Sequence, residues 1–222
     1  MKTKTKKSVL SISKNGKHIR RTLRNTVVLA ILLGVVNVAS AQNKLGVKVM
    51  AGGSCQSEIL KISDNNNLQF AYGLGITDNF RFSETFALQT GLEYTRKGMH
   101  NDESNTDLEN TLHYLQLPVL AEFSAGEKAG FKDGKRVYFA AGPYLAYLLD
   151  AESKENDVLI ADKEDFRNYD LGMRFNLGME FPVSEINKLR VGLNYDMGFT
   201  DIYKNQTDMQ NKMCSVSLGF VF

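Results

Sequence analysis

The chain ends in Cys214-Ser215-Val216-Ser217-Leu218-Gly219-Phe220-Val221-Phe222. Large apolar side chains occupy every second position from Val216 to Phe222, and serine, glycine or a small apolar residue stands between them. A β-strand points alternate side chains to opposite faces, so this segment has one apolar face and one small or polar face. The pattern is typical of the closing strand of a membrane β-barrel, in which Phe220 and Phe222 form the aromatic end.

The first 41 residues have the composition of a secretory signal peptide. Residues 1–26 are rich in lysine and arginine, an apolar run follows from Val27 to Val36, and Ala39-Ser40-Ala41 forms a cleavage site. The apolar run spans about ten residues, whereas a membrane-spanning helix needs about 20. We expect residues 1–41 to direct Sec-type export and to be removed. Arg20-Arg21 leaves a twin-arginine signal as the less favoured alternative, because a barrel must reach its membrane unfolded.

Removal of this leader reverses the sign of the net charge. The whole chain has 27 bases and 25 acids. Nine of the bases and none of the acids lie in residues 1–41, so residues 42–222 carry 18 bases against 25 acids. A basic surface is the electrostatic requirement for binding nucleic acid, and we therefore expect no such partner. No later segment has 18 successive apolar residues, which predicts that no helix spans a membrane.

Alternating apolar and polar residues predict eight strands in residues 42–222. The expected segments lie at about 44–55, 68–77, 86–94, 112–124, 136–149, 170–181, 189–196 and 212–222. The fifth is apolar on both faces, and Pro118 within the fourth indicates a bulge. Longer and shorter connections alternate, as in barrels with short periplasmic turns and long external loops. We therefore predict an all-β fold, an eight-stranded antiparallel up-and-down transmembrane β-barrel, with both ends on the periplasmic side.

The composition of the two strand faces separates a membrane barrel from a soluble one. In a lipocalin-like barrel the apolar set would surround a ligand and the other set would face water. Here the other set consists mainly of glycine, serine and asparagine with isolated charges, while the apolar set is almost free of charge. The sequence favours lipid contact, and an exported soluble ligand-binding barrel remains the alternative.

Short motifs occur in a fixed order along residues 41–222. They are Ala41-Gln42, Tyr114-Leu115-Gln116-Leu117-Pro118-Val119-Leu120, Ala141-Gly142-Pro143-Tyr144, Tyr169-Asp170-Leu171-Gly172, Asn194-Tyr195-Asp196-Met197-Gly198 and the terminal Phe222. Through these motifs the chain resembles the small outer-membrane β-barrel proteins of the porin family, common in the Bacteroidota group of bacteria. The resemblance implies an outer-membrane location and recognition of the C-terminal aromatic strand by the barrel-assembly machinery. It implies no shared enzymatic activity or catalytic residues.

The strand phase predicts a polar network inside the barrel. Eight strands enclose a space just wide enough for side chains to fill. The charged side chains expected to point inward are Glu93, Glu122, Asp170, Arg174, Glu180, Arg190 and Asp196. Because a buried unpaired charge is costly, we expect ion pairs in which Arg174 and Arg190 are the central cations. A narrow path for ions or small solutes is the alternative function of this interior.

Two cysteines lie on the strands expected to meet at the closure of the barrel. Cys55 lies near the outer end of the first strand and Cys214 near the outer end of the last. An exported protein can keep a disulfide, provided that the two Cα atoms come within about 7 Å. A Cys55–Cys214 disulfide and two unpaired thiols are both compatible with the sequence.

The polar loops offer binding surfaces but no recognisable catalytic or metal site. Residues 99–110 contain four acids and no base, and residues 150–167 contain seven acids and three bases. An extracellular ligand or a cation is therefore a candidate partner. Only His100 and His113 are available to an acyl-cleaving or protease site, and their candidate partners are Asp102, Glu103, Ser104 and Asp107. We expect a monomer in outer-membrane lipid, without enzymatic activity, cofactor or metal, whose role is structural, adhesive or weakly pore-forming.

Several tyrosines are candidates for the aromatic girdles that mark the two membrane interfaces. They are Tyr94, Tyr114, Tyr138, Tyr144, Tyr147 and Tyr195. Packing inside the barrel is the competing interpretation for Tyr114, because its strand phase points inward.

Overall fold

The computed structural model describes residues 43–57, 68–103, 106–127, 130–156, 158–204 and 209–222. The signal peptide expected at residues 1–41 lies outside these ranges. The strands are β1 (Asn43–Ser57), β2 (Gln69–Arg81), β3 (Phe86–Glu103), β4 (Thr106–Ala125), β5 (Arg136–Glu155), β6 (Val158–Asp162), β7 (Tyr169–Pro182), β8 (Lys188–Asp201) and β9 (Gln210–Val221). Among the described residues, no helix is long and apolar enough to cross a membrane.

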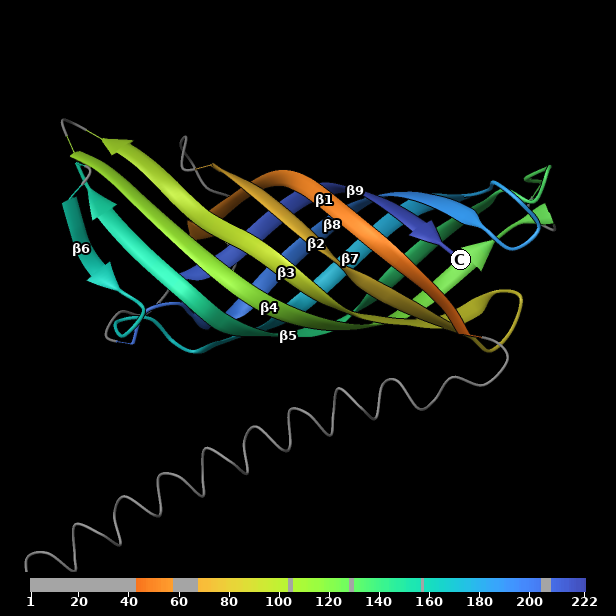
Figure 1. Ribbon diagram of the computed structural model, residues 1–222, viewed down its shortest axis with the longest axis horizontal. Helices are drawn as coiled ribbons and strands as arrows, with labels where there is room; N and C mark the ends of the chain where they lie inside the picture. Colours follow the sequence, from red (N-terminus) through yellow and green to blue (C-terminus); the bar gives the residue numbers. More distant parts are fainter. Residues whose placement is uncertain (1–42, 58–67, 104–105, 128–129, 157, 205–208) are drawn as a thin grey trace, which may run out of the picture. The chain divides into compact units, whose positions relative to one another are not determined.

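Eight of these strands form a closed antiparallel barrel (Figure 1). Their order is β4-β3-β2-β1-β9-β8-β7-β5, and pairing of β4 with β5 closes the ring. The terminal strand β9 lies between β1 and β8, with Leu218 opposite Val49 on one side and Val191 on the other. The predicted eight-stranded barrel is confirmed. Closure leaves no unpaired edge within the ring, which lets every strand satisfy its backbone groups.

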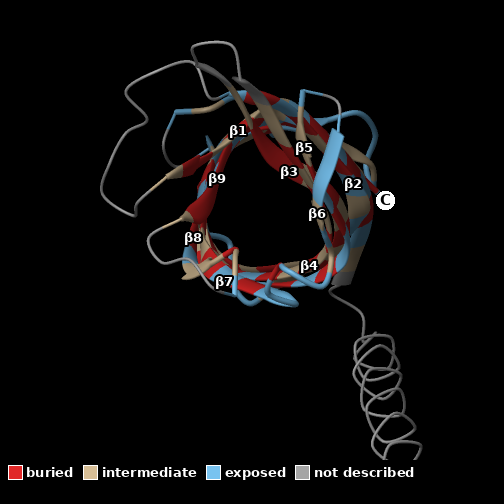
Figure 2. Cartoon of the chain, turned by 90° about the vertical axis from the view of Figure 1, so that its left-hand side faces the viewer, coloured by how far each residue is buried: buried red, intermediate tan, exposed pale blue. Residues whose placement is uncertain are grey.

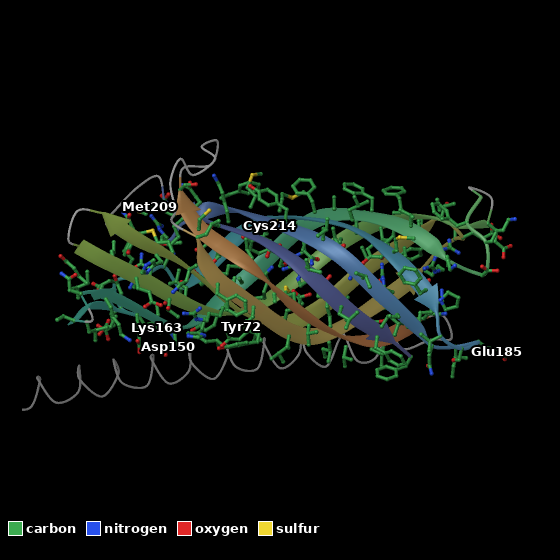
Figure 3. All side chains as sticks on the ribbon, turned by 90° about the horizontal axis from the view of Figure 1, so that it is seen from above. Tyr72, Asp150, Lys163, Glu185, Met209 and Cys214 are labelled. Carbon is green, nitrogen blue, oxygen red and sulfur yellow. The ribbon has the colours of Figure 1, made fainter. Side chains whose placement is uncertain are left out.

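The two faces of the barrel differ as the alternation predicts. On β9, Val216 and Leu218 are exposed on the outer surface, whereas Ser215 and Ser217 are buried inside. An end-on view shows this alternation of buried and exposed residues around the ring (Figure 2). A side view shows mainly carbon-rich side chains projecting outward from the middle of the barrel (Figure 3). The apolar outer set is suited to lipid and the polar inner set to a filled interior.

The barrel has two unlike ends. Connections 82–85, 126–135 and 183–187 lie at one end, with the start of β1 and the end of β9, and we call it the turn end. At the other end, which we call the loop end, β1, β3, β5 and β8 end and β2, β4, β7 and β9 begin. Here β3, β4 and β5 continue well past the expected strand limits, and β6 pairs with the last residues of β5.

The prediction of a polar loop at residues 99–110 is wrong for most of these residues. Met99–Glu103 pairs with Thr106–Asn110 in a continuous ladder, and only residues 104 and 105 lie between the strands. Backbone pairing does not require an apolar face, so a strand that leaves the lipid loses the alternation but keeps its hydrogen bonds. The short strand β6 was missed for the same reason, because it lies in the expected acidic loop at residues 150–168.

The β3–β4 ladder lacks pairs at Leu117 and Pro118, but the bulge expected at Pro118 occurs elsewhere in β4. Pro118 keeps the regular register opposite Tyr144, and its carbonyl accepts a hydrogen bond of 2.9 Å from the Thr90 hydroxyl. The register between β4 and β5 shifts instead between His113 and Tyr114. This shift leaves Leu149 without a partner on β4 and separates the lipid-facing part of β5 from its extension.

Candidate functional site

The centre of the barrel interior is organised around Arg174 of β7. Its guanidinium binds Asp196 of the neighbouring strand β8 through two hydrogen bonds, of 2.5 and 2.7 Å. A third nitrogen, Nη1, lies 2.5 Å from Oε2 of Glu93 on β3. The side chain of Arg174 is fully buried at 0% exposure. Three charge-assisted hydrogen bonds therefore hold this cation in the lumen.

Two lysines complete this central cluster. Lys48 of β1 forms an ion pair with the other carboxylate oxygen of Glu93. Lys97 of β3 lies 3.5 Å from Asp196 and 3.8 Å from Asp170, and its ammonium sits 4.5 Å above the ring of Tyr144. Three bases thus face three acids in the middle of the barrel, and the ring of Tyr144 adds a cation–π contact.

A second cluster lies nearer the turn end, around Arg190 of β8. Its Nη2 lies 2.6 Å from Glu122 of β4, its Nε lies 3.9 Å from Glu180 of β7, and its guanidinium stacks 3.9 Å from the ring centre of Tyr138. Arg81 approaches both carboxylates to 3.9 Å, and Lys188 forms an ion pair with Glu180. The bases outnumber the acids here, in contrast to the balanced central cluster.

The structure brings the seven sequence-predicted lumen residues together as two groups. Glu93, Asp170, Arg174 and Asp196 lie in the central cluster, and Glu122, Glu180 and Arg190 lie in the turn-end cluster. All seven are buried. The prediction omitted Lys48, Lys97, Gln116, Arg81 and Lys188. Strand parity could have found Lys97, because it follows Glu93 and Thr95 on the same face of β3.

Small residues make room for the inward-pointing tyrosines. A Cβ atom at Gly172 would lie 2.6 Å from the hydroxyl of Tyr144, and one at Gly192 would lie 2.7 Å from that of Tyr138. Tyr114, Tyr138 and Tyr144 are all buried in the interior. They belong to the lumen and not to the outer surface, so the competing interpretation holds for Tyr114 and the expected girdle is wrong for Tyr138 and Tyr144. The inward phase of Tyr138 and Tyr144 was hidden because β5 is apolar on both faces.

An apolar cluster of buried residues lies inside the barrel near the loop end. Phe166 and Ile202 come from two different loops, are 0% and 2% exposed, and pack against inward residues of β4 and β5. Those residues are Leu112, Tyr114, Tyr144, Ala146, Leu148 and Ala151. The Arg167 amide donates a 2.7 Å hydrogen bond to the carbonyl of Ile202, which joins the two loops. We call this group the loop-end plug.

A family model for the outer membrane protein beta-barrel domain matches residues 32–204. The chain belongs to this outer-membrane β-barrel family. The structure of the outer membrane protein OprG from Pseudomonas aeruginosa has the same fold, with a TM-score of 0.50 and 12% identity, and the match covers 82% of this chain and 96% of OprG. No curated protein matches the sequence.

Two further solved structures are similar at lower scores. Neisserial surface protein A has a TM-score of 0.47 and 16% identity over 80% of this chain and 95% of that protein. The outer membrane enzyme PagL has a TM-score of 0.42 and 12% identity over 78% of this chain and 97% of PagL. Family membership places the barrel in the outer membrane and disfavours the soluble lipocalin-like alternative.

The orientation of this outer-membrane barrel follows from where its lipid-facing surface ends. On β5 the apolar outward positions begin at Val137, next to the turn end, and stop at Leu149, although the strand continues to Glu155. The strands thus extend beyond the lipid only at the loop end. Because such barrels carry their longer segments outside the cell, we expect the loop end on the extracellular side.

The outer surface near this boundary carries the predicted histidine His113. Its Nδ1 lies 2.5 Å from the hydroxyl of Tyr94, and the two rings stack with centres 5.8 Å apart. His100 lies in the same hairpin opposite Glu109. Within the described ranges, no group of three His, Cys, Asp or Glu side chains is arranged to hold a metal ion. The side chains of Asp102, Glu103, Ser104 and Asp107 lie outside the description.

The two cysteines lie at the β1–β9 seam of the barrel, where the sequence predicted them. Both thiols are free. Cys55 is opposite Lys212, and Cys214 is opposite Gly53, so the cysteines are offset by two residues in the register. Diagonal positions of this kind lie about 7–8 Å apart, beyond the usual separation in a disulfide. The possible disulfide is thus not formed in the structure.

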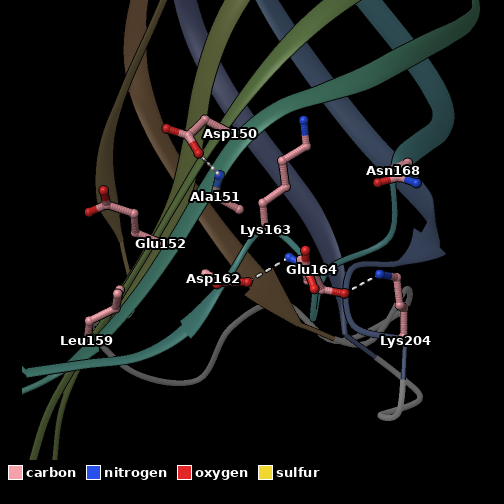
Figure 4. A pocket seen from close by; sticks show the side chains of 9 residues that line it. All are labelled: Asp150, Ala151, Glu152, Leu159, Asp162, Lys163, Glu164, Asn168 and Lys204. Atoms are coloured by element: carbon pink, nitrogen blue, oxygen red, sulfur yellow. Dashed lines mark hydrogen bonds between the residues drawn. The ribbon is translucent and has the colours of Figure 1, made fainter.

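A hollow opens on the extracellular rim beside β6. It has a volume of about 680 Å³ and is shown in Figure 4. Its lining residues are Asp150, Ala151, Glu152, Leu159, Asp162, Lys163, Glu164, Asn168 and Lys204. Both lysine ammoniums are bound by backbone carbonyls, Lys163 by that of Leu149 at 2.6 Å and Lys204 by that of Glu164. Four carboxylates thus share a water-accessible site with two lysines that already have partners.

Proposed function

We propose that the protein is a non-enzymatic, monomeric outer-membrane barrel that presents an extracellular surface for structural or adhesive contacts. The observation that carries this proposal is the filled interior. The central cluster around Arg174 and the loop-end plug around Phe166 occupy successive levels of the lumen. A barrel filled in this way serves as a membrane anchor. Binding of partners is then a function of the segments outside the lipid.

The extracellular part is built as a rigid sheet. The last residues of β3 and β5 form continuous ladders with the first residues of β4, and β6 adds a fourth strand to them. Hydrogen-bonded strands hold their side chains in place, which lowers the entropic cost of binding a partner. This support favours an adhesive or partner-binding role for the loop end.

Export and assembly follow from the two ends of the chain. Residues 1–41 act as the Sec-type signal peptide, and the terminal strand acts as the signal for the barrel-assembly machinery. Phe220 packs edge-on against Phe222 with ring centres 5.3 Å apart, and the Phe222 amide donates a 2.8 Å hydrogen bond to Leu45. The motif order supports a relationship to the porin family of Bacteroidota.

The absence of enzymatic activity is part of the proposal. Acyl-cleaving sites need a nucleophile, a base and a group that orients the base. His113, the best-placed base, has its Nδ1 engaged by the phenol of Tyr94, which is a weak nucleophile at neutral pH. This arrangement favours a girdle contact over a catalytic one.

A narrow ion path is the second candidate, favoured by the polarity of the lumen between the two clusters. Side-chain oxygens of Gln116, Asn176 and Asn194 are buried there without a protein hydrogen-bond partner. Such atoms are normally satisfied by water, so this part of the interior is suited to hydration. Passage of an ion would still require movement of both Arg174 and the loop-end plug.

Single-channel recording distinguishes these two functions. Purified residues 42–222, refolded and inserted in planar bilayers, are expected to give no resolved current steps. The control is a variant that carries both Arg174→Ala and Phe166→Ala, in which side chains that fill the lumen are removed. This variant is expected to raise the leak current. Regular conductance steps from the unmodified protein would overturn the proposal and establish the narrow-pore alternative.

A further inference from the structure

β6 is the exposed edge strand of the extracellular sheet. Its backbone pairs with β5 on one side, from Glu152 opposite Asp162 to Glu155 opposite Val158. In the order of the sheet β6 is terminal, and no described strand pairs with its other side. It stands at the far left of the barrel in Figure 1 and at the front of the view in Figure 2. An unpaired edge of this kind is a template for another strand.

The side chains of β6 are unusual for an exposed edge. Val158, Leu159 and Ile160 are 64%, 56% and 52% exposed, so apolar groups face water on both sides of the strand. Protected edges normally carry charges or proline at such positions. Three successive apolar residues instead favour pairing with an incoming strand, whose side chains would cover them on alternate faces.

Ile160 marks the position where β6 is least bound to the rest of the sheet. Ser153 is opposite Ala161 and Lys154 is opposite Leu159, so Ile160 falls at the register shift and has no partner on β5. A substitution at Ile160 therefore alters the free edge with little effect on the β5–β6 ladder.

Charge next to the edge selects the kind of incoming strand. The hollow in Figure 4 shares Leu159 and Asp162 with β6 and holds four carboxylates. The two lysines of the hollow donate hydrogen bonds to the backbone carbonyls of Leu149 and Glu164. Lys154, which is not part of the lining, forms an ion pair of 3.1 Å with Glu152. The net charge of the lining is negative, which favours a lysine or arginine side chain from the partner.

The same charges disfavour a second copy of the chain as the occupant. A second copy of β6 at this edge would bring an acidic hollow of its own towards the hollow of the first copy. Like charges opposite each other destabilise a strand pair. The edge is therefore complementary to a different, basic sequence.

We propose that β6 binds an extended segment of an extracellular protein by strand addition, with alternating apolar and basic side chains. The apolar side chains cover Val158 and Ile160 on one face, and on the other face a basic side chain enters the acidic hollow beside Leu159. This inference rests on the proposed surface function of the loop end and adds the chemistry of its partner.

The test uses three fluorescent peptides with the refolded barrel in detergent micelles. The probe is Lys-Val-Lys-Val-Lys-Val-Lys, and its fluorescence anisotropy measures binding. The first control has methyl groups on alternate backbone nitrogens, which removes edge hydrogen bonds but keeps charge and apolar area. The second control replaces every lysine by glutamate. We expect each control peptide to bind at least about tenfold more weakly than the probe.

Two substitutions locate the site on the protein. Ile160→Pro removes an edge N–H, and Ile160→Lys adds a repelling charge; both are expected to weaken probe binding by at least about tenfold. Ile186→Lys at the turn end, where Ile186 is 69% exposed, is the matched control and should leave binding unchanged. Circular dichroism verifies that each variant keeps its strands. If Ile160→Pro does not fold, Ile160→Lys alone tests the position of the site.

Three results would overturn strand addition. Equal binding of the methylated peptide would reduce the interaction to charge alone, and equal binding by the Ile160 variants would place it elsewhere. A dimer that sediments as such and is lost in Ile160→Pro would make a second copy the occupant. None of these results bears on conduction, so failure of this inference is distinct from failure of the proposed function.

Discussion

Arg174 of β7 and Glu93 of β3 meet inside the barrel, where Nη1 and Oε2 lie 2.5 Å apart. Their strands are not neighbours in the ring, so this ion pair crosses the lumen. Lys48 of β1 binds the same carboxylate, and Asp196 of β8 binds the same guanidinium. Four strands are thus tied together by groups that could not be left unpaired at this depth.

Arg174→Met is expected to destabilise the barrel by about 3–5 kcal/mol, because Glu93 and Asp196 would lose their main buried counter-charge. Urea unfolding in micelles, followed by far-UV circular dichroism since the chain has no tryptophan, measures the change. Lys132→Met removes a base from an exposed turn and should cost less than about 0.5 kcal/mol. Equal stability of the two variants would show that the central cluster contributes little.

Gly192→Ala is expected to cost about 1–3 kcal/mol, because its Cβ would crowd the hydroxyl of Tyr138. Tyr138→Phe removes that hydroxyl and keeps the ring beside Arg190. The double variant should therefore be less destabilised than the sum of the two single variants. The free energies of unfolding of all four proteins measure the coupling, and strict additivity would contradict the predicted contact.

Phe166→Ala is expected to loosen the loop-end plug without unfolding the barrel. Its ring packs in an apolar cluster and stacks 4.8 Å from that of Tyr203. Hydrogen exchange should accelerate at the Arg167 amide, which donates to Ile202, and stay unchanged at the Leu218 amide in β9. Unchanged protection of Arg167 would mean that the two loops hold together without the aromatic side chain.

Deletion of Phe222 is expected to impair assembly in the cell more than stability in the test tube. The terminal residue contributes one backbone hydrogen bond and an exposed ring. If the barrel-assembly machinery reads this ring, the variant should accumulate unfolded in the periplasm yet refold normally in detergent. Phe82→Ala, at a 66% exposed position in a turn, is the control and should assemble normally. Normal assembly of the deletion variant would show that Phe222 is not part of the assembly signal.

The offset of the cysteines predicts which pair can be cross-linked. Cys55 and Cys214 should stay reduced under mild oxidation, because Gly53 and not Cys55 is opposite Cys214. A variant with Gly53→Cys and Cys55→Ser places two cysteines in a direct pair, within the range that a disulfide spans. Non-reducing electrophoresis and mass spectrometry compare the two proteins. Rapid oxidation of the unmodified pair would contradict the register at this seam.

The sequence by itself determined the eight strands of the barrel, their faces and seven of the charged residues that lie in the lumen. This information is local, because alternate positions of a strand face opposite sides and the lipid requires one side to be apolar. The same reasoning failed beyond the lipid, where the paired residues 99–110 and β6 lack the alternation of apolar and polar residues that reveals a strand. It also failed on β5, because inward tyrosines such as Tyr144 make both faces apolar.

Only the tertiary structure decided which groups meet. Parity assigns Arg174 and Glu93 to the interior, but their height depends on the tilt and stagger of the closed barrel. The same stagger places Gly53 opposite Cys214 and brings Phe166 and Ile202 together from separate loops. The apolar and polar pattern of each strand repeats every two residues and does not specify this stagger. Register is a property of strand pairs in the assembled sheet.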